Sequence, residues 1–221
     1  MTLTSQKIRI KEINCQIVQM STLVEKQLYA SMLALKNHDL EIIDKIMKED
    51  DKVDELQKKI EEECIKFIAS EQPLAKDLRN VFTATKVVTD FERMADYSVD
   101  ICKIIKRMNN DATDFEGDTL SLWVMEEKIR KMISLATNAY VNIDEEQAYE
   151  ICKMDDEIDS LYKTIFESTL KNVKLDEVRA NKNAQLLFVA KYLERVADHV
   201  TNICEWIIFS KTGEYVDLNE W

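Results

Sequence analysis

Glycine and proline are almost absent from this chain, and their scarcity limits its fold more than any other sequence feature. Only two glycines and one proline occur among the 221 residues, where average usage would supply about 26 of these two residue types. A β-sheet needs both residues at its tight turns. We therefore expect an all-α protein in which few turns connect long helices.

The same scarcity excludes several nucleotide-binding and catalytic motifs. Gly117 and Gly213 are the only glycines, so the chain has no P-loop, no dinucleotide-binding Gly-x-Gly fingerprint and no Gly-x-Ser-x-Gly nucleophile elbow. The five cysteines include no Cys-x-x-Cys pair, which excludes a zinc ribbon and a thioredoxin motif. Because their number is odd and no apolar leader precedes them, we expect reduced thiols and a cytoplasmic protein.

The charge balance narrows the classes of binding partner. The chain carries 30 Lys and Arg against 42 Asp and Glu, a net charge of −12. Such a surface repels nucleic acids and anionic lipids but suits cations and basic protein surfaces. The sequence therefore does not predict nucleic-acid binding. It contains no apolar run of about 18 residues that could span a bilayer, so we expect the protein to contact a membrane only through its partners.

Apolar residues recur every three or four positions through most of the chain, as in helices with one buried face. In the first half the pattern predicts a helix from Ile10 to Leu35 and a second that Asp39 caps and that ends before Gln72. Pro73 is expected at an early position of a third helix, which continues to about Cys102.

The second half shows the same succession after a polar segment. Residues 109–119 are acidic and contain one glycine, which is typical of a linker. Helices are then expected from Leu120 to Asn142, from a cap at Asp144 to about Thr169, and from near Leu175 to Phe209.

The two halves are also similar in their residues. Seven of sixteen residues are identical between 90–105 and 192–207, and 47–56 aligns with 152–161. The repetition predicts two tandem three-helix bundles related by a pseudo-twofold. We place the first repeat at 1–111, a linker at 112–119 and the second repeat at 120–221.

Both repeats carry pairs of acidic residues spaced i, i+4, which places two carboxylates on one face of a helix. The pairs are Asp50 with Asp54, Glu92 with Asp96, Asp155 with Asp159, and Glu194 with Asp198. A single pair is typical of a solvated helix face. Duplication at matching positions on neighbouring helices favours two cation sites instead, because clustered carboxylates select hard cations.

The positions four residues beyond these motifs distinguish the two candidate sites. Asp100 is a fifth potential ligand in the first site, whereas Asn202 offers only a neutral oxygen in the second. The second site is therefore expected to bind the weaker or smaller cluster. Helical geometry at 100° per residue places Glu92, Asp96 and Asp100 on the outer surface or its edge rather than in the core.

These motifs resemble those of a known family. The sequence resembles the PhoU family of phosphate-transport regulatory proteins along nearly its whole length, through the duplicated Glu/Asp-x-x-x-Asp motifs ERMAD at Glu92 and ERVAD at Glu194. The segments EQPLAKDLRNVFTATKV at Glu71 and CEWIIFSKTGEY at Cys204 are also similar.

The resemblance implies several functional properties. It implies multinuclear iron or zinc clusters on the carboxylates. Mn, Mg or Ca are alternatives for such oxygen ligands, and we expect a homodimer. It implies repression of the phosphate-starvation response without catalysis, together with a Pst-type ABC phosphate importer and a membrane sensor histidine kinase.

Two other functions fit the residues less well. A di-metal hydrolase would use carboxylate-bridged metals to activate water, but no nucleophile stands beside a base. A metal-independent helical adaptor would leave the acids solvated.

Several further residues have two possible roles. Arg93 and Arg195 flank the acids and either orient them or form ordinary surface ion pairs, and His199 is either a structural residue or a ligand. Cys102 and Cys204 are expected to be buried. The run from Trp206 to Phe209 is expected to pack in the core or to meet a partner.

Overall fold

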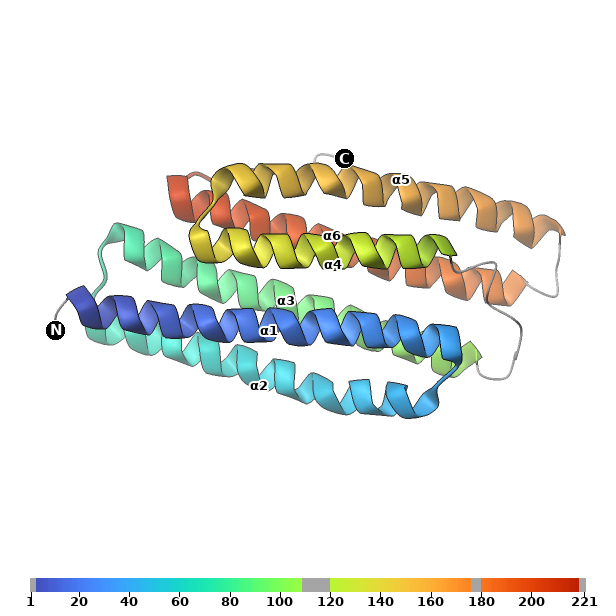
Figure 1. Cartoon of the computed structure of the whole chain (residues 1–221), viewed down its shortest axis with the longest axis horizontal. Helices are drawn as coiled ribbons and strands as arrows, with labels where there is room; N and C mark the ends of the chain where they lie inside the picture. Colours follow the sequence, from blue (N-terminus) through green and yellow to red (C-terminus); the bar gives the residue numbers. More distant parts are fainter. Residues whose placement is uncertain (1–2, 109–119, 176–179, 219–221) are drawn as a thin grey trace.

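The computed structural model describes residues 3–108, 120–175 and 180–218 and contains six α-helices in these ranges (Figure 1). The helices are α1 (Leu3–Asn37), α2 (Leu40–Glu71), α3 (Ala75–Met108), α4 (Leu120–Asn142), α5 (Glu145–Leu175) and α6 (Ala180–Thr212). The expected all-α class is confirmed. The expected linker at 112–119 lies outside the described residues.

The predicted helix boundaries at polar caps are confirmed. Asp39 Oδ1 accepts hydrogen bonds from the backbone N–H groups of Glu41 (2.9 Å) and Ile42 (3.1 Å), and Asp144 Oδ1 accepts one from Gln147 (3.0 Å). These bonds satisfy donors that the first turn of a helix leaves unpaired. Gln72 ends α2 with a left-handed backbone (φ 47°).

Four predicted boundaries were wrong. Helix α3 begins at Ala75, so Pro73 precedes it; the Leu74 carbonyl accepts the first helical hydrogen bond, from Leu78 N–H. Helix α5 continues past Thr169 to Leu175, and α6 runs from Ala180 to Thr212. Leu170, near the end of α5, is exposed. Apolar periodicity therefore fades before the helix ends.

The six helices form two three-helix repeats packed side by side. Helices α1, α2 and α3 contact one another, as do α4, α5 and α6, and the repeats meet through α3 with α6 and α1 with α4. Contacts from α3 to α6 run in opposite chain directions: Arg79 reaches the carbonyl of Ser210, and Thr83 reaches that of Trp206. The helices α3 and α6 are thus antiparallel neighbours, as Figure 1 shows.

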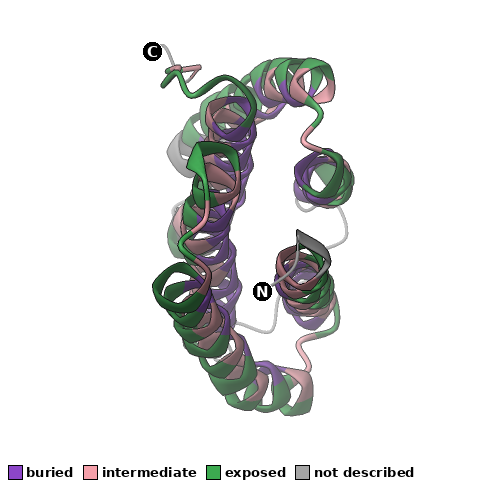
Figure 2. Cartoon of the chain, turned by 90° about the vertical axis from the view of Figure 1, so that its left-hand side faces the viewer, coloured by how far each residue is buried: buried purple, intermediate pink, exposed green. Residues whose placement is uncertain are grey.

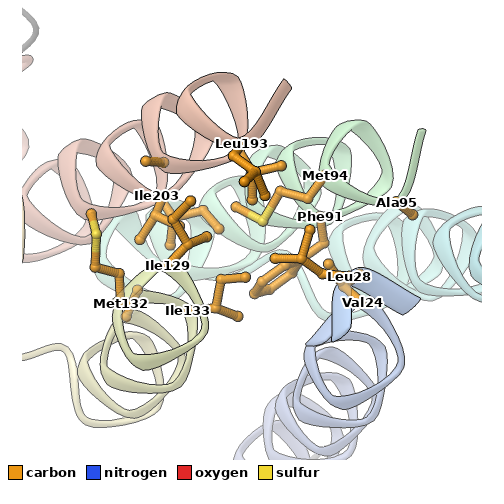
Figure 3. Packing of buried hydrophobic residues seen from close by; sticks show 14 of the residues in the cluster. Val24, Leu28, Phe91, Met94, Ala95, Ile129, Met132, Ile133, Leu193 and Ile203 are labelled. Atoms are coloured by element: carbon orange, nitrogen blue, oxygen red, sulfur yellow. The ribbon is translucent and has the colours of Figure 1, made fainter. Parts of the chain in front are cut away.

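One continuous hydrophobic core serves both repeats. Viewed from the end of the bundle, the buried faces of the helices point inward (Figure 2). In Figure 3 Leu28 of α1, Phe91 of α3 and Ile133 of α4 point toward a common interior region, and each is fully buried. Cys102 and Cys204 are buried as expected. The shared core means that each repeat covers apolar surface of the other.

The run from Trp206 to Phe209 packs within this chain, and its contact with a partner stays a prediction. Ile207 and Ile208 are buried in the core, whereas Trp206 and Phe209 are half-buried beside Phe82 of α3.

Among the described residues, no helix combines the length and the apolar character that crossing a bilayer requires.

Candidate metal centre

The four predicted acids of the second repeat face one another across a cleft between α5 and α6. Asp155 and Asp159 lie one turn apart on α5, and Glu194 and Asp198 lie one turn apart on α6. The cleft has a volume of about 370 Å³. Its lining consists of Cys152, Asp155, Asp156, Asp159, Glu194, Arg195, Asp198, His199, Asn202, Asp217 and Leu218.

Burial and mutual repulsion disfavour the charged form of these acids. The pKa of Asp155 is raised to about 7, mainly by burial and then by the charges of Asp159 and Asp198. Burial, reinforced by the charge of Asp198, raises the pKa of Asp159 and of Glu194 as well. A cation placed among these groups would reverse both effects, because it favours the ionised form.

Two oxygens in this cleft have unmet hydrogen-bonding capacity. Asp155 is 9% exposed and Glu194 is 6% exposed, yet Asp155 Oδ1 and Glu194 Oε2 find no hydrogen-bond partner among the described residues. Their other oxygens are engaged: Asp155 Oδ2 accepts from Thr201 (3.3 Å) and Glu194 Oε1 from Lys191 (2.6 Å). Buried polar atoms without a partner are rare and call for a ligand, an ion or water.

The first repeat brings its four predicted acids together in the same way. The pKa of Asp50 is raised to about 6, first by burial and then by the charges of Asp54 and Asp96. Burial and Asp96 raise the pKa of Glu92. Glu92, Asp96 and Asp100 are half-buried, as the helical geometry predicted. Glu194, the counterpart of Glu92, is instead buried.

The fifth predicted position differs between the repeats. Asp100 forms an ion pair with Lys103 (2.7 Å) one turn further along α3. Asn202 lines the second cleft, where its Nδ2 donates to Asp90 Oδ1 (3.3 Å). Neither contact tests whether these residues bind metal, and both assignments stay predictions.

Lysine and arginine side chains supply the positive charge that the acids face in this structure. Arg93 Nη1 lies 3.1 Å from Asp96 Oδ2, and Arg195 Nη1 lies 3.1 Å from Asp198 Oδ2. Lys191 pairs with Glu194. The two arginines therefore do contact the motif acids, and they do so at equivalent positions of the two repeats.

Sequence reasoning missed three parts of the second site. Asp90, on α3 of the first repeat, lies 2.8 Å from His199 Nδ1. Leu218 N–H donates to Glu205 Oε1 (2.7 Å), which holds Asp217 at the cleft. Cys152 lines the cleft one turn before Asp155. The one-turn spacing of Cys152 was visible in the sequence, but the other two contacts join segments that no local pattern relates.

The carboxylate oxygens of these acids are suitable ligands for a hard cation, although their side chains do not converge on one point in this structure. Clustered carboxylates and two buried unpaired oxygens match the ligands of Mg²⁺, Ca²⁺, Mn²⁺ and carboxylate-bound iron. In the described part of the chain, however, no group of three or more His, Cys, Asp or Glu side chains is arranged to hold an ion. Binding would therefore require acids such as Asp198 to turn away from their present partners.

Comparison with known proteins shows where this architecture occurs. The family model described as PhoU domain matches residues 17–105 and 122–207. A phosphate-specific transport system accessory protein PhoU homolog of Clostridium acetobutylicum is 43% identical over 96% of both chains. The homolog of Zymomonas mobilis is 33% identical over 90% of this chain and 83% of its own.

Solved structures agree with these sequence matches. The phosphate transport system regulatory protein PhoU of Streptococcus pneumoniae is 27% identical, with a TM-score of 0.87 over 96% of this chain and 99% of the other. PhoU of Pseudomonas aeruginosa has a TM-score of 0.88 over 94% of this chain and 99% of its own; at 24% identity it supports the fold alone. With two family-model matches, one in each three-helix repeat, and relatives aligned over nearly their full length, this chain belongs to the PhoU family.

Proposed function

We propose that this protein is a regulatory accessory protein of phosphate uptake that represses the phosphate-starvation response. The observation that carries the proposal is the 43% identity, over 96% of both chains, to a relative named as an accessory protein of the phosphate-specific transport system. The proposed partners are a Pst-type ABC importer and a membrane sensor histidine kinase. The protein acts by binding them, in the cytoplasm and as a homodimer, and it catalyses no reaction.

The same proposal includes metal at the two carboxylate sites. In the second repeat Asp155, Asp159, Glu194 and Asp198 would hold it, and the two unpaired oxygens support this assignment. The matching acids of the first repeat would hold the other site. Bound cations would supply the positive charge that clustered acids lack, and would tie α5 to α6 and α2 to α3.

One observation favours a metal-independent adaptor as the second candidate. The acids already have protein counter-charges, since Arg93, Arg195 and Lys191 each contact a motif carboxylate. In that case the acids would be a partly solvated, internally paired surface. Partner binding would then be insensitive to metal.

A gene deletion tests the regulatory role directly. Deletion should make transcription of phosphate-responsive genes constitutive, and the wild-type gene should restore its response to phosphate. An unchanged response in the deletion strain would contradict the role. Complementation by the Asp96→Ala, Asp198→Ala double variant separates the two candidates: it fails if metal is needed and succeeds for a metal-independent adaptor.

A further inference from the structure

The two carboxylate sites differ in the donors that surround them. The second cleft is lined by Cys152 and His199 in addition to its acids. By the repeat alignment, the first repeat has Met47 in place of Cys152 and Tyr97 in place of His199. We infer that the second site is a mixed sulfur, nitrogen and oxygen site that selects Zn²⁺, Co²⁺ or Fe²⁺, whereas the first is an oxygen site for harder cations. The inference rests on the proposed metal binding and concerns which metal each site takes.

The environment of His199 is that of an oriented metal ligand. Its Nδ1 lies 2.8 Å from Oδ1 of Asp90, a carboxylate that is 8% exposed. Asp90 Oδ1 can accept a hydrogen bond from Nδ1–H, and in that tautomer Nε2 is the ring nitrogen whose lone pair can bind a metal. Histidines that bind metal through one nitrogen commonly donate the other N–H to a carboxylate. Asp90 belongs to the first repeat, so the second site depends on a residue from the other bundle.

Only one of the two second-repeat cysteines can reach a metal in this cleft. Cys152 lies on α5 and lines the cleft. Cys204 lies on α6, is fully buried and is not among the residues that line the cleft. Cys152 is therefore the sulfur available to a metal.

Donor chemistry determines which metal each site prefers. Thiolate and imidazole ligands favour zinc, cobalt and iron, whereas carboxylates alone suit Mg²⁺, Ca²⁺ and Mn²⁺. Counting acids alone predicts that the second site is the weaker one. With Cys152 and His199 included, the order reverses for Zn²⁺ and Co²⁺, and we expect these ions to fill the second site first.

Cobalt provides a spectroscopic test, because a Co²⁺–thiolate bond gives a charge-transfer band in the near ultraviolet. The full-length protein, freed of metal by chelation, is titrated with Co²⁺ and separately with Zn²⁺ against Mn²⁺. The key variant is Cys152→Met with His199→Tyr, which copies the residues of the first repeat. It should lose the band, and its preference for Zn²⁺ over Mn²⁺ should fall by about tenfold or more. Cys152→Ser alone should also lose the band.

Two controls isolate the site. Cys102→Ser changes the thiol at the position equivalent to Cys204. Cys102 is buried in the core and does not line the second cleft, so this variant should keep both the band and the metal preference. Asp96→Ala empties the first site, and should leave the cobalt band in place. Far-ultraviolet circular dichroism checks that each variant remains helical.

The outcomes separate the inference from the proposed function beneath it. If wild-type protein retains no metal at either site, the metal part of the proposed function is wrong, and the inference is overturned with it. If metal binds with no thiolate band, or if the double variant keeps the wild-type preference, the inference alone is overturned and both sites are oxygen sites.

Discussion

His199 of α6 contacts Asp90 of α3 at 2.8 Å, and this contact joins the second repeat to the first. The repeat alignment places Tyr97 at the position of His199 and Tyr192 at that of Asp90. These tyrosines stack on each other with ring centroids 5.7 Å apart. The pseudo-twofold thus repeats the contact between α3 and α6 but fills it once with a polar pair and once with an aromatic pair.

Removing Asp90 should weaken the interface between the repeats. Asp90→Ala removes the carboxylate that His199 Nδ1 and the Asn202 amide contact, and hydrogen bonds of this kind contribute about 1–3 kcal/mol. Urea unfolding of metal-free protein should show a loss of this size. Asp44→Ala, which removes an exposed ion pair with Lys106, serves as the control and should cost less than about 1 kcal/mol. Equal losses in the two variants would count against a special role for Asp90.

The metal-free protein should lose stability as the pH rises from about 4 to 7. The folded-state pKa of Asp155 is about 7 and that of Asp50 about 6, both above the usual value of 3.8. The folded state therefore holds protons that the unfolded chain has already released, and unfolding becomes easier as these protons are lost. Urea unfolding at pH 5 and pH 8 measures the difference.

The Asp50→Asn, Asp155→Asn double variant is the matched test of that pH dependence. It removes both titrations with little change of shape, so its stability should vary less between pH 5 and pH 8. A wild-type protein that is more stable at pH 8 in the absence of metal would contradict the raised pKa values of Asp50 and Asp155.

Each metal site should be removable without the other. Asp96→Ala should abolish metal retention in the first repeat only, and Asp198→Ala in the second only, as elemental analysis after loading and desalting would show. Without metal, each change should be neutral or stabilising by a few tenths of a kcal/mol, because it relieves repulsion between acids. If loaded wild-type protein retains no more metal than the double variant, the site assignment is wrong.

Bound metal should stabilise the wild-type fold in proportion to its occupancy. A ligand of the folded state at 100 times its Kd adds about 2.7 kcal/mol by mass action. The melting temperature should therefore rise with metal concentration in the wild type and stay constant in the Asp96→Ala, Asp198→Ala variant. A rise of equal size in both proteins would indicate binding elsewhere on this acidic surface.

The two repeats should unfold together. Phe91 is fully buried in the core that α1, α3 and α4 share (Figure 3), and Phe91→Ala should cost about 3–5 kcal/mol. Because the core is continuous, circular dichroism should follow a single urea transition in wild type and variant alike. A stable intermediate that keeps about half of the helical signal would contradict this expectation.

Much of the fold could be predicted because its signals are local. The spacing of apolar residues predicts the helices, Asp39 and Asp144 mark two of their starts, and the alignment of 90–105 with 192–207 reveals the repeat. The boundary errors at Pro73 and at the end of α5 have a local cause too. Leu74 and Leu170 are exposed, so apolar spacing does not mark the boundary beside either residue.

The sequence by itself determined the helical class, the internal duplication and the identity of the eight paired acids, because each depends on residue type and spacing within one helix. Tertiary structure alone decided that Asp155 and Glu194 are buried, that Asp90 of one repeat orients His199 of the other, and that Cys152 lines the second cleft. These relations depend on which helices pack together and in what register. That register results from the fit of side chains across a shared core, which spacing along the chain does not encode.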